Sequence, residues 1–160
     1  GRRVAIVTGA GGMAVAAAEA AGRQGLELAV FSSETTRELE KHLPPAGTSR
    51  ANPVDLSLAA HMAPDLFIHA ASAVAADPTV DAVVVIGSGL DETTNDHYVE
   101  AMIEARRKSG KVLLAVAIPG MPGESGRVFC RAGIPFFETV EKAMAAYARV
   151  AAYYAGATPP

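Results

Sequence analysis

The stretch that decides the fold is VAIVTGAGGMAV, residues 4–15. Its opening residues are apolar and mostly β-branched, which is typical of a strand buried on both faces. Gly9, Gly11 and Gly12 then permit backbone angles and close approaches that a Cβ would block. From Met13 through Ala21 nearly every residue favours a helix. The stretch therefore predicts a strand, a tight glycine turn and a helix.

The same turn is a candidate anion site. A helix that begins in such a turn directs unpaired backbone N–H groups outward at the positive end of its dipole. The alternative is that the glycines only let the helix pack close to the sheet. The order of strand, glycine turn and helix favours the anion site. The residues expected to form it are Thr8, Gly9, Ala10, Gly11, Gly12 and Met13.

Composition limits the class of protein. The chain has 160 residues, of which half are apolar, and a net charge of −3. This length suits one domain with a core of its own. The sequence lacks the basic stripe expected of a nucleic-acid-binding protein and an apolar run long enough to span a bilayer. We therefore expect no nucleic-acid partner, no membrane partner and no signal peptide. Its single cysteine excludes an internal disulfide and fits a reducing compartment, so we expect a cytoplasmic location.

The two ends of the chain suggest an excised piece of a longer polypeptide. The first residue is Gly1, and the first expected strand begins almost at once. We expect one domain over residues 1–155 and a linker over residues 156–160.

Apolar strand patterns alternate with helical patterns along the whole chain. The expected strands are 3–8, 26–31, 80–86, 111–118 and 134–137. The expected helices are 12–24, 34–42, 64–76, 95–108, 124–132 and 140–154, and Gly25 and Gly110 are read as helix stops. This alternation predicts an α/β protein with a five-stranded, doubly wound parallel sheet between two helical layers. We expect strand order 2-1-3-4-5 rather than a longer dinucleotide-binding sheet, because only five strands are visible.

Ligands of such sheets gather at the carboxyl ends of the strands, near the point where the strand order reverses. The turns after the first and third strands should face each other there, so Gly87, Ser88 and Gly89 are expected to support the site. Asn52 and Asp55 are further candidates. Pro53 holds Asn52 extended, so Asp55 could accept hydrogen bonds from the glycine turn; equally, this segment could be a plain turn.

No catalytic residue and no metal ligand is expected in this domain. The four histidines, His42, His61, His69 and His97, do not lie at metal-ligand spacing. We expect them to be packed or exposed, with His97 nearest the crevice. Cys130 is expected to be buried and inert. The glycine turn fits the G-x-G-x-x-G/A dinucleotide fingerprint, but residues 31–33 read Phe-Ser-Ser where that fingerprint requires an acid.

Several segments, taken together in order, resemble one known family across almost the whole chain. The chain is similar to the NDP-forming acyl-CoA synthetases, which include ADP-forming acetyl-CoA synthetase and succinyl-CoA synthetase, and specifically to their second flavodoxin-like ligase domain. The segments that carry the resemblance are Val4–Gly12, Gly25–Ala29, Leu43–Pro45, Asn52–Leu56, Asp77–Val83, Gly123–Arg127 and Ala132–Pro135.

The resemblance implies a role in phosphoryl transfer. These enzymes pass a phosphoryl group between an acyl phosphate and a nucleotide through a phosphohistidine, and two flavodoxin-like domains point helix amino termini at it. The matching helix here begins in the turn from Gly9 to Met13. The phosphohistidine itself is expected in another domain.

The resemblance also implies partners and cofactors. The partners would be the CoA-binding, phosphohistidine-bearing and ATP-grasp domains, with a homo-oligomer possible. ATP or ADP, Mg and CoA would serve the full enzyme, with no cofactor bound by this domain alone, and the isolated domain would be inactive. Two other classes stay open: an NAD(P)-binding oxidoreductase domain, and a non-catalytic regulatory or assembly module.

Overall fold

The structure, a computed structural model, describes residues 1–57, 59–63, 65–87, 92–118, 120 and 123–156. The strands are β1 (Arg3–Thr8), β2 (Glu27–Leu28), β3 (Val54–Asp55), β4 (Ala82–Gly87), β5 (Val112–Ala117) and β6 (Phe136–Phe137). The helices are α1 (Gly11–Arg23), α2 (Ser33–His42), α3 (Ala59–Met62), α4 (Asp65–Ala76), α5 (Glu92–Ser109), α6 (Gly123–Arg131) and α7 (Val140–Gly156).

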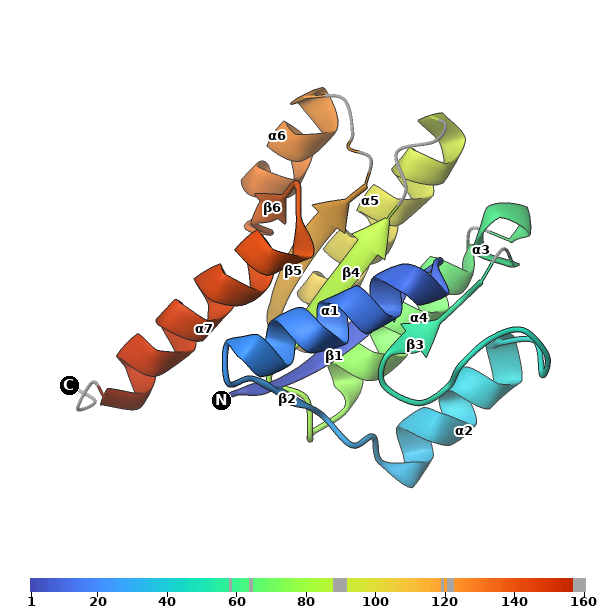
Figure 1. Cartoon of the computed structure of the whole chain (residues 1–160). Coiled ribbons are helices and arrows are strands. Elements are labelled where there is room, and N and C mark those ends of the chain that lie inside the picture. Colours follow the sequence, from blue (N-terminus) through green and yellow to red (C-terminus); the bar gives the residue numbers. More distant parts are fainter. Residues whose placement is uncertain (58, 64, 88–91, 119, 121–122, 157–160) are drawn as a thin grey trace.

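All six strands form one parallel sheet (Figure 1). Along its main path the order is β2-β1-β4-β5-β6, which confirms the order expected for the five predicted strands. The count of five is wrong, because β3 also pairs with β1. β2 pairs with the beginning of β1, where Arg3 is opposite Glu27. β3 pairs with the end of the same strand, where Thr8 is opposite Asp55.

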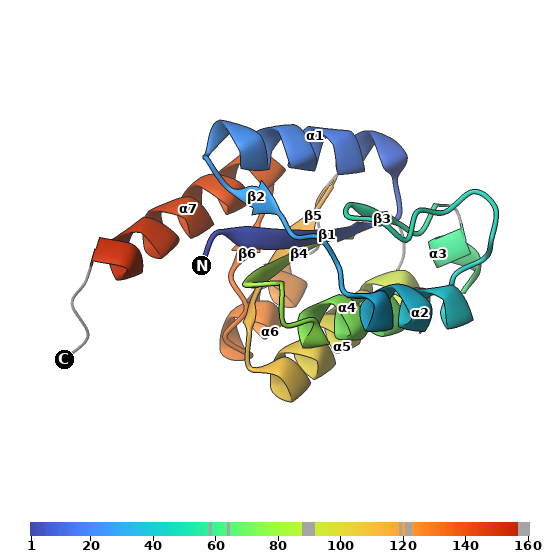
Figure 2. The same cartoon turned by 90° about the horizontal axis from the view of Figure 1, so that it is seen from below.

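Helices cover both faces of the sheet. Figure 2 shows α1 and α7 on one side, and α2, α4, α5 and α6 on the other. Successive residues of β1 serve the two layers in turn: Val4 and Ile6 pack in the core that faces α1 and α7, whereas Ala5 and Val7 pack in the other. This alternation explains why the strand is apolar at every position. The predicted three-layer α/β/α architecture is confirmed.

The amino ends of the strands are tied together by two aspartates. The Asp81 carboxylate accepts hydrogen bonds from the backbone N–H of Arg3 at 2.9 Å and from its guanidinium at 3.0 Å. The guanidinium bond lowers the pKa of Asp81 to about 2. Asp77 is buried, which by itself would raise its pKa; hydrogen bonds from Thr35, Thr79 and Ser32 nevertheless hold that pKa far below its usual value.

Several element boundaries differ from the prediction. The second strand was expected over 26–31 but pairs only at Glu27–Leu28, because the chain then leaves the edge of β1. The short helix α3 was not expected. The expected start of the next helix, Pro64, lies outside the described residues. Gly25 and Gly110 do end helices, with φ of 66° and 65°.

Candidate functional site

The turn between β1 and α1 is held by its own backbone. Thr8 is buried, and its hydroxyl accepts a hydrogen bond from the Ala10 N–H at 3.2 Å. The Ala10 carbonyl accepts from the N–H groups of Met13 and Ala14, which begins the helix. Ala10 has no side chain that could cap α1. The N–H groups of Gly11 and Gly12 therefore stand at the start of a 13-residue helix with no side-chain cap.

Two of the three glycines of this turn, Gly11 and Gly12, differ in the space around them. A Cβ at Gly11 would lie 2.9 Å from Oδ2 of Asp55, so a larger residue here would have to displace that carboxylate. A Cβ at Gly12 would meet no atom within 4 Å. The open space in front of α1 is therefore at Gly12.

Asp55 reaches the turn because β3 pairs with the end of β1. Its Oδ1 accepts a hydrogen bond from the Ser57 N–H at 2.8 Å, which fixes the carboxylate, and Oδ2 lies beside Gly11. A carboxylate at this place interacts favourably with the helix dipole. It also means that any anion approaching Gly12 meets a negative charge.

Asn52 has partners in the sheet rather than in the turn. Its Oδ1 accepts from the Ile6 N–H at 3.0 Å, and its Nδ2 donates to the carbonyls of Val4 and Ala29 at 2.7 and 3.0 Å. The side chain fills the edge of β1 between the places where β2 and β3 pair. Its observed role is to satisfy backbone groups at that edge.

Gly87, the last residue of β4, leaves space for the ring of Tyr98. A Cβ there would lie 2.8 Å from the ring of Tyr98, which is fully buried. The Tyr98 hydroxyl donates to the Val85 carbonyl at 2.6 Å and accepts from the Val116 N–H at 3.1 Å. Burial raises the pKa of Tyr98. The two other expected residues of this turn, Ser88 and Gly89, lie outside the described residues.

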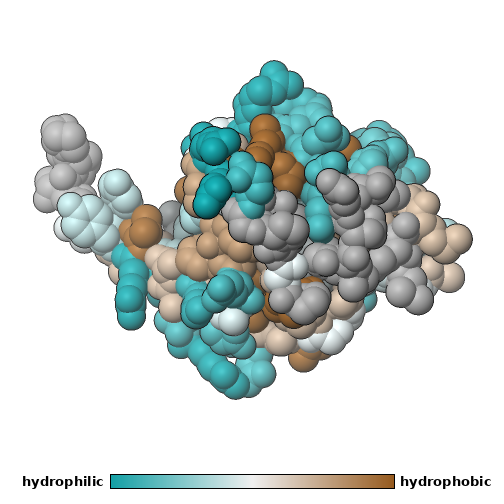
Figure 3. Space-filling model, turned by 90° about the horizontal axis from the view of Figure 1, so that it is seen from above, coloured by the Kyte–Doolittle hydropathy of each residue, from teal (hydrophilic) through white to brown (hydrophobic). Residues whose placement is uncertain are grey.

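The first turn and the end of β4 meet in a small hollow, which we term the switch-point crevice. It has a volume of about 50 Å³ and is lined by Thr8, Gly9, Ala10, Met13, Phe67, Ile86, Gly87 and Ile118. The expectation that the two strand ends face each other is thus confirmed for their described residues. None of the described lining residues is ionisable. Figure 3 looks onto this end of the molecule, where hydrophobic surface gathers next to hydrophilic surface.

The histidines are distributed as follows. His97 lies on α5 with Nε2 3.8 Å from an Asp65 carboxylate oxygen. The rings of His42 and His69 stack 3.8 Å apart, a contact that the sequence spacing did not suggest. The His61 side chain is outside the described set. Within the described parts of the chain, no group of three or more His, Cys, Asp or Glu residues could hold a metal ion. Also, no described helix is long and apolar enough to cross a membrane.

A doubly wound parallel sheet with a glycine turn at its switch point defines a flavodoxin-like α/β domain. A model of the Ligase-CoA domain matches residues 4–103, more than half of the chain. The chain therefore belongs to the Ligase-CoA domain family.

Similar proteins come from archaea. The alpha subunit of ADP-forming acetate–CoA ligase II of Pyrococcus furiosus is 36% identical over 157 residues, which cover 94% of this chain and 34% of that subunit. The crystal structure of PH0766 from Pyrococcus horikoshii OT3 has a TM-score of 0.85 and 31% identity, over 98% of this chain and 37% of that one.

A third relative is similar in fold alone. Dinucleotide-forming acetyl-coenzyme A synthetase 1 of Ca. Korarchaeum cryptofilum, solved in complex with phosphate and ADP, has a TM-score of 0.76 and 23% identity. The match covers 99% of this chain and 36% of that protein. The chain thus spans about a third of the length of each of these relatives.

Proposed function

We propose that this chain is the second flavodoxin-like ligase domain of an ADP-forming acyl-CoA synthetase. In this proposal its switch-point crevice receives a phosphohistidine carried by another domain. The N–H groups at the start of α1 stabilise the phosphoryl group electrostatically, in the way that preorganised donors stabilise developing charge. A helix dipole beside such a group contributes about 0.3–1 kcal/mol, and up to about 2 kcal/mol when the site is partly buried.

The observation that carries the proposal is the open amino terminus of α1 at the switch point. The site has no ionised lysine or arginine in its described lining, so attraction would come from backbone dipoles. Its volume of about 50 Å³ is close to the space of one or two waters. A crevice of this size suits the tip of a phosphorylated side chain rather than a whole nucleotide.

Asp55 would make this site prefer a phosphohistidine over free phosphate. A free phosphate dianion would be repelled by the carboxylate beside Gly11. A phosphohistidine whose ring is protonated also carries an N–H on its second ring nitrogen, and this N–H would donate to that carboxylate while the phosphoryl group faces the helix. We propose that Asp55 favours the phosphorylated ring over free phosphate.

The rest of the reaction belongs to domains outside this chain. We propose that the CoA-binding, phosphohistidine-bearing and ATP-grasp domains of the parent enzyme use ATP or ADP, Mg and CoA, and that residues 1–155 are catalytically silent alone. Formation of acyl-CoA from a carboxylic acid, ATP and CoA by this chain by itself would contradict the proposal.

The site can be tested by amide NMR with inorganic phosphate. The native chain should bind phosphate with millimolar affinity, equivalent to about 4 kcal/mol, with shifts at Gly9 to Met13. Gly12→Val would fill the open space before α1 and should abolish these shifts. Gly22→Val is the matched control, because a Cβ at Gly22 also meets no atom within 4 Å but lies near the other end of α1.

Asp55→Asn tests the preference. Removing a unit charge about 4 Å from the anion is worth about 1 kcal/mol in water, so phosphate should bind roughly fivefold more tightly. Shifts that appear only after Gly87, or between Gly120 and Gly126, would place the anion at another turn and contradict the role of α1. Unchanged phosphate affinity in Asp55→Asn would remove Asp55 from the site.

In the parent enzyme, Gly12→Val should reduce the steady-state level of phosphohistidine, whereas Gly22→Val should not. Equal levels in both variants, measured by phosphate labelling, would contradict the proposed function.

A further inference from the structure

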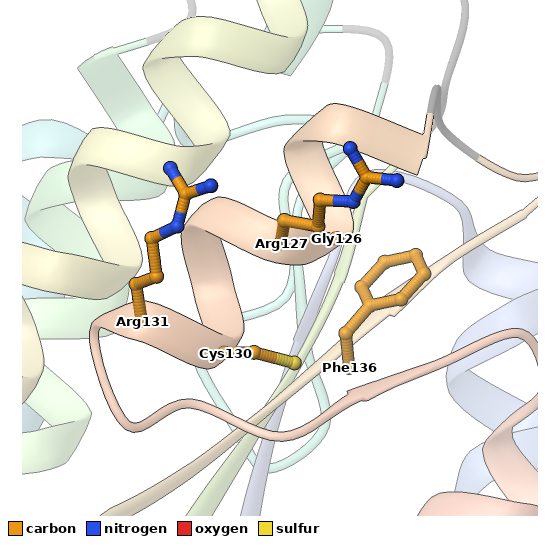
Figure 4. Close-up of a pocket in the computed structure, with 5 residues that line it drawn as sticks. All are labelled: Gly126, Arg127, Cys130, Arg131 and Phe136. Atoms are coloured by element: carbon orange, nitrogen blue, oxygen red, sulfur yellow. The ribbon is translucent and has the colours of Figure 1, made fainter.

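A second hollow lies at the β6 edge of the sheet, between α6 and β6. This α6–β6 cavity has a volume of about 500 Å³ and is lined by Gly126, Arg127, Cys130, Arg131 and Phe136 (Figure 4). This cavity is wide and largely open to solvent, so it would cover one side of a ligand rather than enclose it. None of these residues belongs to the switch-point crevice.

The cavity is open because of a glycine. Gly126 lies four residues before Cys130 on α6, so no side chain covers the sulfur, and Cys130 is exposed. The expectation that Cys130 is buried is therefore wrong. Gly126 also uncovers the ring of Phe136, whose Cδ1 would be 3.4 Å from a Cβ at that position.

Phe136 gives the cavity a fixed aromatic wall. Its ring stacks on the fully buried ring of Phe129, with centroids 5.8 Å apart and an interplanar angle of 6°. The packing restrains the ring, while part of its surface lines the cavity. A restrained ring can stack on a flat ligand at little cost in conformational entropy.

Two arginines provide positive charge. Arg127 and Arg131 lie four residues apart on α6 and share one carboxylate, that of Glu124, at 3.2 and 3.7 Å. Both side chains are 72% exposed. Like charges at this spacing disfavour a helix, and each guanidinium has five N–H donors, so one carboxylate leaves most of them available.

The surroundings add to this charge. The last turn of α5, which packs against α6, contains Arg106, Arg107 and Lys108, and Lys108 pairs with Glu104. The whole chain has a net charge of −3, so this basic surface contrasts with the rest of the molecule. Electrostatic complementarity points to an anionic occupant.

We propose that the α6–β6 cavity binds a small ligand that combines a phosphate with a flat aromatic ring, as a mononucleotide does. Arg127 and Arg131 hold the phosphate through charge-assisted hydrogen bonds, and the ring lies against Phe136. This site is separate from the crevice, and it does not rest on the proposed phosphohistidine function.

The single cysteine makes occupancy measurable without any enzymatic assay. Alkylation of Cys130 by iodoacetamide, a neutral reagent, reports access to the cavity. Adenosine 5′-monophosphate should slow this reaction in a saturable way. At about ten times Kd, alkylation should slow about tenfold, because only about a tenth of the protein is then unoccupied. Adenosine or inorganic phosphate alone, at the same concentration, should protect much less.

Three variants define the site. The double variant Arg127→Gln, Arg131→Gln should weaken protection about tenfold or more, whereas Arg149→Gln, on α7, should leave it unchanged. Gly126→Ala keeps both charges but narrows the cavity, and it should also abolish protection. For every variant the rate with ligand is divided by its own rate without ligand, which corrects for altered thiol access.

The proposal fails if adenosine 5′-monophosphate does not slow alkylation at 10 mM, a concentration that exceeds the millimolar range of weak ligands about tenfold. It also fails if inorganic phosphate protects equally, or if the double arginine variant is protected as well as the native chain. Failure here leaves the phosphate-shift test at Gly9 to Met13 unaffected.

Discussion

Under the two proposals, the switch-point crevice and the α6–β6 cavity attract an anion in two different ways. The crevice is small, its described walls are uncharged, and the attraction that we propose there comes from the start of α1. The cavity has about ten times the volume, and its potential comes from Arg127 and Arg131 on exposed side chains. Backbone dipoles are fixed by the fold, whereas arginines can be replaced without disturbing it. Gly87→Val should therefore damage the crevice through stability, whereas Gly12→Val and the arginine variants should act through binding.

The largest effect is expected for Gly87→Val at the wall of the crevice. The new Cβ would lie 2.8 Å from the buried Tyr98 ring, so the core must shift. Such overpacking should lower the free energy of unfolding by about 3 kcal/mol. Urea denaturation measures it, with Gly12→Val as the control in open space. A loss as small as that of the control would show that the ring can move aside.

Tyr98→Phe should have the next largest effect. It removes the hydroxyl that links the Val85 carbonyl and the Val116 N–H beneath the crevice. Leaving these buried groups without their partner should cost about 2 kcal/mol in unfolding free energy. Urea denaturation of the native chain and the Tyr98→Phe variant in parallel measures this loss. Equal midpoints would mean that the two backbone groups find other partners without the hydroxyl.

The pH dependence of stability tests the Asp81–Arg3 ion pair, which lies at the end of the sheet opposite the crevice. The pKa of Asp81 is about 2 in the folded chain, below its ordinary value of 3.8, so its ion pair with Arg3 contributes stability above about pH 4. That contribution is lost as the pH falls from about 4 to about 2. Because the pair is partly exposed, it should amount to about 1 kcal/mol. Asp81→Asn should flatten the acid limb of the stability curve; an identical limb in both proteins would contradict this assignment.

The smallest effect should have the opposite sign. Gly126→Ala removes a glycine from the middle of α6, and its Cβ would stand 3.4 Å from the nearest atom, the Cδ1 of Phe136. It should raise the unfolding free energy by about 0.5 kcal/mol through helix propensity, while abolishing protection of Cys130. A destabilised Gly126→Ala protein would indicate that α6 and β6 are packed more tightly than the cavity volume indicates.

The main strands and helices could be predicted from the sequence because their signals are local. The apolar run of β1 is continuous, and Gly25 and Gly110 have the positive φ that a helix end requires. The alternation of strands and helices predicted a parallel sheet, and the order of the five expected strands was chosen because only five strand patterns are visible. β3 could not be found in this way, since two residues carry no periodicity and Asp55 pairs with Thr8, 47 positions earlier.

The candidate site was only partly visible in the sequence. The glycine turn and Gly87 could be placed together from topology, but the packing of Tyr98 against Gly87 depends on a tertiary contact. Cys130 was misjudged because its apolar neighbours suggested burial, whereas Gly126 one turn earlier exposes it. A glycine four residues before a helical cysteine was the available signal. No pattern in the sequence pointed to the stacking of His42 on His69.

The amide of Asn52 has a consequence for how the chain meets other copies of itself. Exposed sheet edges are templates on which a strand from a second molecule can form intermolecular β-structure. Between β2 and β3, the N–H of Ile6 and the carbonyl of Val4 are already taken by this one side chain. An incoming strand would find no continuous row of free groups along β1. Asn52 thereby protects the part of the β1 edge that β2 and β3 leave uncovered from pairing with a strand of another molecule.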